Sequence, residues 1–91
     1  MSQVLVEHGP SPMKLEILNV DDWPVRHEPV GVHHRRVEVS ETYYVAEGEA
    51  EIRADGEEPV RVFDGDLLTI LPGTVCVWHI TKEIELHCSN G

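Results

Sequence analysis

Hydrophobic and polar residues alternate along most of this chain, and the alternation has the period of a β-strand. In residues 49–54, Ala50, Ile52 and Ala54 alternate with charged residues, so this segment predicts a strand with one apolar face and one face in water. Similar alternation, or a short continuous apolar run, predicts further strands. They cover residues 3–7, 13–20, 30–39, 42–47, 60–63, 67–71, 75–80 and 84–88.

Glycine and proline mark the connections between these segments. Asp55-Gly56 lies between two alternating runs and is a strong hairpin signal, because both central residues of such a turn need positive φ. Asp64-Gly65-Asp66 and Pro72-Gly73 enclose the apolar run 67–71, and Gly48 predicts a further turn. No segment keeps a helical period for three turns. The pattern therefore predicts an all-β sandwich or barrel.

The last two segments predict a hairpin centred on Lys82. In that hairpin Cys76 lies across from Cys88, on an apolar face that also carries Trp78. A disulfide between the two cysteines is then possible by reach but is not required. The chain shows no export signal, which favours free thiols in a reducing compartment.

The length and the distribution of proline predict a simple domain organisation. A chain of 91 residues is long enough for one domain and too short for two. Gly9, Pro10 and Pro12 predict a flexible arm over residues 1–13, followed by a single domain over residues 14–91 in which Trp23 anchors a connection to the core. Because a domain of this size has little stability to spare, we expect a homodimer.

The charge of the chain limits its partners. Seventeen acidic residues against seven Lys and Arg give a formal net charge of −10, which disfavours nucleic acid and anionic membrane surfaces. No apolar run approaches the roughly 20 residues of a membrane span, and the N-terminus lacks the features of a signal peptide, so a cytoplasmic location is expected. The run His33 to Arg36 is the local exception. It is either a solvated strand or part of a site for a small anion.

Two blocks of residues resemble the signature of the cupin superfamily. In the first block, Glu41 is followed by Gly48 after six residues; in the second, Gly65-Asp66 precedes a turn at Pro72-Gly73, with Cys76 three residues later. The chain is most similar to the branch that contains the cupin domain of ureidoglycine aminohydrolase and the ethanolamine-utilisation cupin. The motifs shared with that branch are Trp23-Pro24, the run from Glu41 to Gly48, Gly65-Asp66-Leu67-Leu68-Thr69, the run from Gly73 to Trp78, and His87.

The resemblance implies a fold and an incomplete set of metal ligands. The fold is a double-stranded β-helix, the RmlC-like jelly-roll barrel, which is often dimeric. Counting back from Glu41, the histidine pair of the superfamily falls on His34 and Arg36, and its third histidine falls on Cys76. A guanidinium group cannot be a ligand. His34, Glu41 and Cys76, with His33 as a substitute for His34, would suit one divalent metal such as Zn, Ni, Fe or Mn.

The alternative is that the protein holds no metal. Cys76 would then be a small buried hydrophobic residue and His34 a polar strand residue. The resemblance also points Glu41 into the barrel mouth, where Arg36 or a metal would offset its charge.

The leading hypothesis for function is the binding of a small polar or anionic metabolite at the barrel mouth. One of the adjacent residues Tyr43 and Tyr44 must face the interior, because neighbouring strand residues point to opposite faces. A metal-dependent enzyme of the isomerase, aminohydrolase or dioxygenase type and a non-catalytic assembly module are the alternatives, and the sequence does not decide whether the protein is an enzyme. The expected ligand-binding residues are Glu41, Arg36, Tyr43 and Trp78, with His34 and Cys76 nearby.

Overall fold

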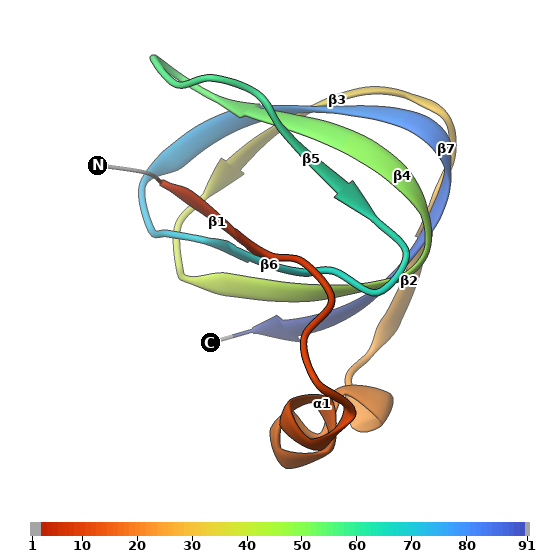
Figure 1. Ribbon diagram of the computed structural model, residues 1–91. Helices are drawn as coiled ribbons and strands as arrows, with labels where there is room; N and C mark the ends of the chain where they lie inside the picture. Colours follow the sequence, from red (N-terminus) through yellow and green to blue (C-terminus); the bar gives the residue numbers. More distant parts are fainter. Residues whose placement is uncertain (1–2, 91) are drawn as a thin grey trace.

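Two long antiparallel strands form the framework of the molecule, whose computed structural model describes residues 3–90 (Figure 1). They are β4 (Glu41–Ala54) and β7 (Thr74–Asn90), and they pair from Glu41 opposite Asn90 at one end to Ala54 opposite Cys76 at the other. The shorter strands of this seven-stranded sheet are β1 (Val4–Glu7), β2 (Val25–Glu28), β3 (Gly31–Val37), β5 (Val60–Phe63) and β6 (Leu67–Ile70).

The short strands pair with successive parts of the two long ones. On the edge of β4 that does not face β7, β6 pairs with residues 41–44 and β5 pairs with residues 49–52. On the edge of β7 that does not face β4, β3 pairs with residues 74–80 and β2 pairs with residues 84–87. β1 extends the sheet beyond β6. The sheet curls into a barrel (Figure 1), and the prediction of an all-β fold is confirmed.

Both long strands are irregular at the same place, where β4 crosses the middle of β7. The register between them shifts at Val45/Glu47, Glu47/Glu49 and Glu49/Ala50. Such shifts bend and twist strands without ending them. The predictions of a turn at Gly48 and of a hairpin at residues 81–83 were therefore wrong, because both strands continue through these points.

Strand parity explains why a hairpin and a continuous strand look alike in this sequence. Even-numbered side chains are buried on both sides of residues 81–83, at 76, 78 and 80 and again at 84, 86 and 88. Cys76 is in register with Ala54, whereas Cys88 is in register with Tyr43, so the two thiols lie near opposite ends of the β4–β7 ladder. Both are free and buried, and the disulfide considered above is not formed.

The barrel interior is filled by apolar side chains from six strands, whereas β2 contributes none to the core cluster. Trp78 and Tyr43 are the largest fully buried side chains, and their rings meet edge to face at 5.5 Å between centroids. The residues in the core cluster are Val4, Val37, Tyr43, Val45, Ala50, Ile52, Ala54, Val62, Leu68, Ile70, Cys76, Trp78, Ile80, Ile84, Leu86 and Cys88.

The N-terminal third differs from the sequence prediction. The strand predicted over residues 3–7 is confirmed as β1, which pairs with β6. Val4 is buried in the core, so this part of the expected flexible arm belongs to the sheet. Its residues 1 and 2 lie outside the described range. The strand expected over residues 13–20 is instead helix α1 (Pro12–Leu18), followed by the short 3₁₀ helix η1 (Val20–Asp22). Neither helix is long and apolar enough to span a membrane.

Capping accounts for the helix. The Ser11 hydroxyl accepts a hydrogen bond from the Lys14 N–H at 3.2 Å, Pro12 occupies the first turn, and Asn19 ends the helix in the left-handed conformation. These end signals outweigh the alternation of Leu15 and Ile17, which had predicted a strand. Trp23 is only half buried and lies outside the core cluster, so its prediction as a core anchor was wrong.

The hairpin predicted at Asp55-Gly56 is confirmed, with a different turn. The pairing of β4 with β5 ends at Ile52 opposite Val60, and Gly56 in the connection has a φ of 76°. Asp55 does not have positive φ, so the tight turn expected from the dipeptide is replaced by a longer loop.

Gly48→Ala is expected to destabilise the protein by roughly 2–4 kcal/mol, in the range of substitutions that create backbone strain. A Cβ at Gly48 would lie 2.4 Å from the Glu83 carbonyl oxygen and 2.6 Å from the Ile84 Cα, and the backbone there has a φ of 105°. Urea unfolding followed by circular dichroism measures the change.

Gly56→Ala is the matched control. Gly56 also has positive φ, but a Cβ there meets nothing within 4 Å, so only the conformational cost of about 1–2 kcal/mol is expected. An equal loss of stability in the two variants would contradict a steric constraint at the crossing of β4 and β7.

Candidate functional site

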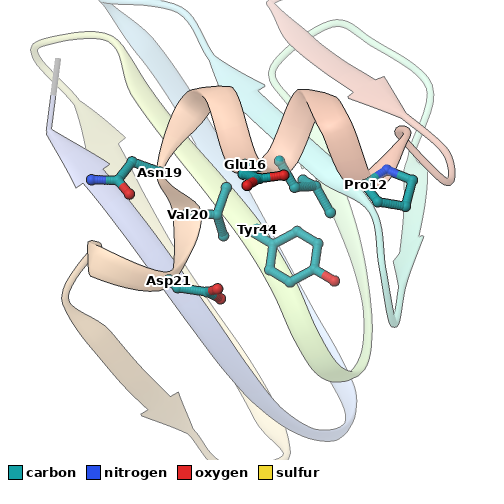
Figure 2. A pocket seen from close by; sticks show the side chains of 7 residues that line it. Pro12, Glu16, Asn19, Val20, Asp21 and Tyr44 are labelled. Carbon is teal, nitrogen blue, oxygen red and sulfur yellow. The ribbon is translucent and has the colours of Figure 1, made fainter.

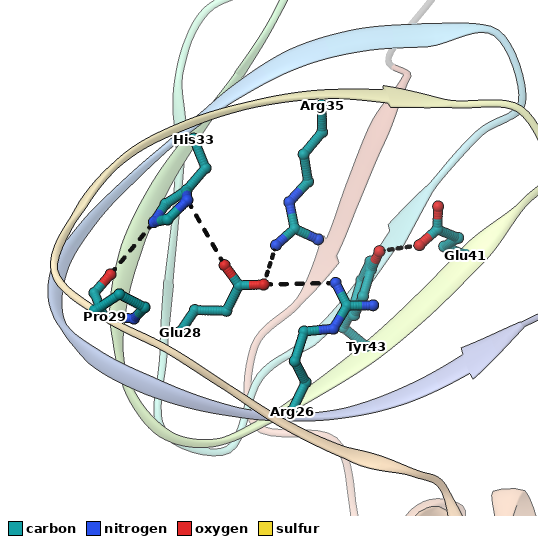
Figure 3. A network of polar contacts seen from close by, with 7 residues as sticks. All are labelled: Arg26, Glu28, Pro29, His33, Arg35, Glu41 and Tyr43. Carbon is teal, nitrogen blue, oxygen red and sulfur yellow. Dashed lines mark hydrogen bonds and ion pairs between the residues drawn. The ribbon is translucent and has the colours of Figure 1, made fainter.

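A group of polar side chains meets inside the barrel where β2, β3 and the beginning of β4 approach one another (Figure 3). Their positions follow from strand alternation: Arg26 and Glu28 share the inner face of β2, and other members share the inner faces of β3 and β4. We call this group the mouth cluster. Its members are Arg26, Glu28, His33, Arg35, Glu41 and Tyr43.

Glu28 is the centre of the mouth cluster. One of its carboxylate oxygens accepts hydrogen bonds from Arg35 and, at 3.5 Å, from Arg26; the other lies 3.8 Å from His33 Nδ1. The side chain is only 11% exposed. Burial acts to raise the pKa of Glu28, but the hydrogen bond from Arg35 and the charges of Arg35, Arg26 and His33 outweigh it and lower the pKa below 4.5. Glu28 is therefore ionised at neutral pH.

Arg35 is held from two sides. Its guanidinium bonds to Glu28 and lies 4.8 Å from the centroid of the Trp78 ring, which adds a cation–π contact. Burial acts to lower the pKa of Arg35, but the hydrogen bond and charge of Glu28 raise it above its usual value. Arg35 is thus a fixed positive charge inside the barrel.

Tyr43 and Glu41 form a second polar pair. The Tyr43 hydroxyl donates a hydrogen bond to Glu41 Oε1. Burial, this hydrogen bond and the negative charge of Glu41 together raise the pKa of Tyr43 well above its usual value. Tyr43 therefore stays protonated and acts as a hydrogen-bond donor at neutral pH.

Cys76 and Trp78 are buried in the core next to Arg35. Burial raises the pKa of the Cys76 thiol, although the Trp78 N–H and the charge of Arg35 act in the opposite direction. The thiol is therefore protonated and a poor nucleophile. Trp78 is fully buried, and within the described part of the chain its Nε1 has no hydrogen-bond partner of normal geometry.

The comparison with family models identifies the fold. The model for the EutQ-like cupin domain matches residues 15–87. The chain belongs to this cupin family. The prediction of a small cupin with a jelly-roll barrel is thereby confirmed.

Solved structures agree with this assignment. A DUF861-family protein from Thermotoga maritima is similar to this cupin with a TM-score of 0.92 and 28% sequence identity, over 97% of this chain and 99% of that one. A DUF1255 protein of unknown function from Acidithiobacillus ferrooxidans has a TM-score of 0.69 and 23% identity, over 70% of this chain and 61% of that one. It shares the fold. A comparison with curated proteins finds no significant match.

The structure brings together part of the site predicted from the sequence of this cupin. Glu41 and Tyr43 belong to the mouth cluster. Cys76 and Trp78 are buried next to it, with Cys76 in register with Arg35 and Trp78 against the Arg35 guanidinium. Tyr44 faces outwards, where its ring meets His87 edge to face. The prediction that the interior receives one of the two tyrosines is therefore confirmed.

His34 and Arg36 were placed on the wrong face of the sheet. Both side chains are exposed on the outside of β3, whereas His33 and Arg35 point inwards. Five residues separate Arg35 from Glu41, one more than the count from the cupin motif assumed. The extra residue reverses the face on which each side chain lies.

Arg26, Glu28 and Arg35 are site residues that the sequence interpretation missed. Val37 could have indicated the correct face of β3. It is buried, and strand alternation counted from Val37 places Arg35 on the inner face as well. Val32 misled this count, because it is apolar yet 58% exposed, and alternation counted from Val32 places Arg35 on the outer face.

The metal site inferred from the superfamily does not fit this cupin. His34 is exposed on the outer face of β3, whereas Glu41 belongs to the mouth cluster and Cys76 is buried in the core. No three His, Cys, Asp or Glu side chains within residues 3–90 are arranged to hold a metal ion. Arg35 lies close enough to act on the Cys76 thiol, and its fixed positive charge would repel a divalent cation there.

A separate hollow of about 390 Å³ lies outside the barrel, between α1 and Tyr44 (Figure 2). It contains none of the ligand-binding or metal-binding residues predicted from the sequence. Its lining residues are Pro12, Leu15, Glu16, Asn19, Val20, Asp21 and Tyr44.

Glu28→Gln is expected to destabilise the protein by about 2 kcal/mol at pH 7, because it leaves two guanidinium groups without their anion. The folded-state pKa of Glu28 lies below its unfolded value of 4.5. The stability that ionised Glu28 provides is therefore complete above about pH 4.5 and is lost as the pH falls through the folded-state pKa. Urea unfolding at several pH values between 7 and 3 should show the two proteins converge in acid.

Glu38→Gln is the control for this experiment. The Glu38 side chain is 79% exposed and lies 3.7 Å from Arg36, so its removal should change stability by no more than about 0.5 kcal/mol. A constant difference between the wild type and Glu28→Gln from pH 7 to pH 3 would contradict the assigned role of Glu28.

Proposed function

We propose that this cupin binds a small carboxylate at the mouth cluster, and that the Arg26 guanidinium donates the hydrogen bonds that hold it. The observation that carries this proposal is the contrast between the two arginines of the cluster. Arg35 is 17% exposed and held by Glu28 and Trp78, whereas Arg26 is 44% exposed and has one long contact of 3.5 Å to Glu28. Arg26 therefore has free donors that face solvent.

The chemistry of the guanidinium group supports a carboxylate as the ligand. Its planar fork of N–H donors matches the two oxygens of a carboxylate and can bind both at once. Arg35, fixed beneath, adds a second positive charge, and Tyr43 adds a neutral hydroxyl next to Glu41. In a chain with a net charge of −10, these two arginines supply the cationic donors of the mouth cluster.

Glu28 and Glu41 limit the charge of the ligand. With Arg26 and Arg35 they make the mouth cluster electrically balanced when His33 is neutral. A small ligand with one or two carboxylates and few other groups suits such a site, whereas a highly charged anion would be repelled by the two acids. The metal-dependent alternative has no comparable support, because the charge of Arg35 acts on Cys76, one of the three ligands inferred for a metal. The protonated, unpaired thiols fit a cytoplasmic location, which forms part of the proposal.

Carboxylate binding should raise the melting temperature of the wild-type protein. Acetate, malonate, succinate and citrate are compared with acetamide in a thermal-shift assay at constant ionic strength. A ligand at 100 times its Kd stabilises the folded state by about 2.7 kcal/mol. The mono- and dicarboxylates should raise the melting temperature, and acetamide should not.

Arg26→Gln should abolish this shift, and Arg61→Gln should preserve it. Arg61 is a suitable control because it lies outside the barrel, with a side chain 57% exposed and paired with Glu49. The proposal fails if none of the carboxylates raises the melting temperature above the acetamide value. It also fails if Arg26→Gln shows the full shift.

A further inference from the structure

Within residues 3–90, Glu41 is the acid of the mouth cluster that has no ion pair. The ion pairs of the cluster all end at Glu28, from Arg26, His33 and Arg35. Glu41 is half-buried, and one of its oxygens, Oε1, accepts the hydrogen bond from the Tyr43 hydroxyl. Its other oxygen is turned away from Tyr43 (Figure 3). Glu41 therefore offers a free acceptor and a negative charge that the described residues do not pair.

The cations that could offset the charge of Glu41 are engaged elsewhere. Arg36, which was expected from the sequence to do so, is exposed on the outer face of β3. Arg35 is bonded to Glu28 and lies against the Trp78 ring, so its charge is already paired. A half-buried carboxylate without a counter-ion loses hydration and gains no nearby opposite charge. Such a departure from good packing of charges is typical of a ligand-binding position.

Strand register places Arg26 and Glu41 on either side of Tyr43. These three residues lie opposite residues 86, 88 and 90 of β7 in turn, and alternation puts those positions of β7 on one face. Burial and Glu41 raise the pKa of Tyr43, while the charges of Arg35 and Arg26 act in the opposite direction. The acid and the guanidinium groups are thus within electrostatic range of the same hydroxyl. A small ligand over Tyr43 would lie between a cationic and an anionic group.

We propose that the ligand of the mouth cluster is a small amino acid, whose carboxylate binds Arg26 and whose ammonium group binds Glu41. The ammonium site depends on the carboxylate site proposed above, since one zwitterionic ligand must supply both charges. Charge balance favours such a ligand. The two arginines and two glutamates of the cluster cancel when His33 is neutral, so a simple carboxylate adds an excess negative charge and a zwitterion adds none.

Matched ligands separate the contribution of the ammonium group from that of the carboxylate. Isothermal titration calorimetry of the wild type at pH 7 and constant ionic strength compares acetate with glycine, propionate with β-alanine, and butyrate with 4-aminobutyrate. In at least one pair the amino acid should bind about tenfold more tightly than the simple acid, because it adds a charge-assisted hydrogen bond to Glu41. The hydroxy acid of the same length keeps a donor without the charge, and it should bind about as weakly as the simple acid.

Glu41→Gln should change the affinities for the two kinds of ligand in opposite directions. The substitution removes the attraction for an ammonium group and also the repulsion of a bound carboxylate. The variant should bind the amino acid at least about fivefold less tightly than the wild type does, and the simple acid at least as tightly. A merely structural role of Glu41 would weaken both.

Two further variants complete the experiment. Arg26→Gln should weaken the binding of both kinds of ligand, because both use their carboxylate there. Glu38→Gln is the control for the loss of an acid, since the Glu38 side chain is 79% exposed outside the mouth cluster, and it should keep the wild-type affinities. Near-ultraviolet circular dichroism checks that each variant is folded. If Glu41→Gln is not folded, the ligand pairs on the wild type decide the question without it.

Three results would contradict a zwitterionic ligand: amino acids that bind no more tightly than their matched acids, a hydroxy acid that binds as tightly as the amino acid, or equal weakening of both kinds of ligand in Glu41→Gln. Each of these results includes binding of the simple acids, so the carboxylate site would stand while the ammonium site falls. Absence of binding by all the acids and all the amino acids would contradict both sites.

Discussion

The architecture depends on the close passage of β4 over β7 at Gly48. The Glu83 carbonyl oxygen and the Ile84 Cα occupy the space that a side chain at position 48 would need. Because the two backbones can approach there, both strands bend and continue instead of ending in turns. Each strand then pairs with two short strands in succession along its other edge. This arrangement closes the barrel and brings β2, β3 and the start of β4 to a common mouth.

The chemistry of the mouth follows from one ion pair in this closed barrel. Glu28 on β2 and Arg35 on β3 are largely withdrawn from water, and they stabilise each other's charge. Trp78 lies beneath the guanidinium and completes its support. Arg35 is thereby a fixed positive charge inside the barrel. Arg26, which is 44% exposed, remains as the guanidinium with donors to offer a ligand.

The fold could be predicted from the sequence because strand alternation and the cupin motifs both indicate it. The sequence also predicted that Glu41, Tyr43, Cys76 and Trp78 face the interior. It failed where one residue decides the outcome. Because one extra residue lies between β3 and β4, His33 and Arg35 face the interior in place of His34 and Arg36. The exposed apolar residue Val32 had indicated the opposite face. The helix at residues 12–18 was missed because capping by Ser11 and Asn19, and not hydrophobic periodicity, defines it.

A titration with succinate, followed by ¹H–¹⁵N NMR spectroscopy, tests the central claim that the mouth cluster binds a carboxylate. The fully buried Trp78 N–H, which lacks a normal partner in the described structure, provides a reporter inside the barrel. The account predicts that the largest changes occur in residues 25–28 and 31–37 and in the Trp78 indole signal. Changes confined to the hollow beside α1 and Tyr44, or no changes at saturating succinate, would contradict it.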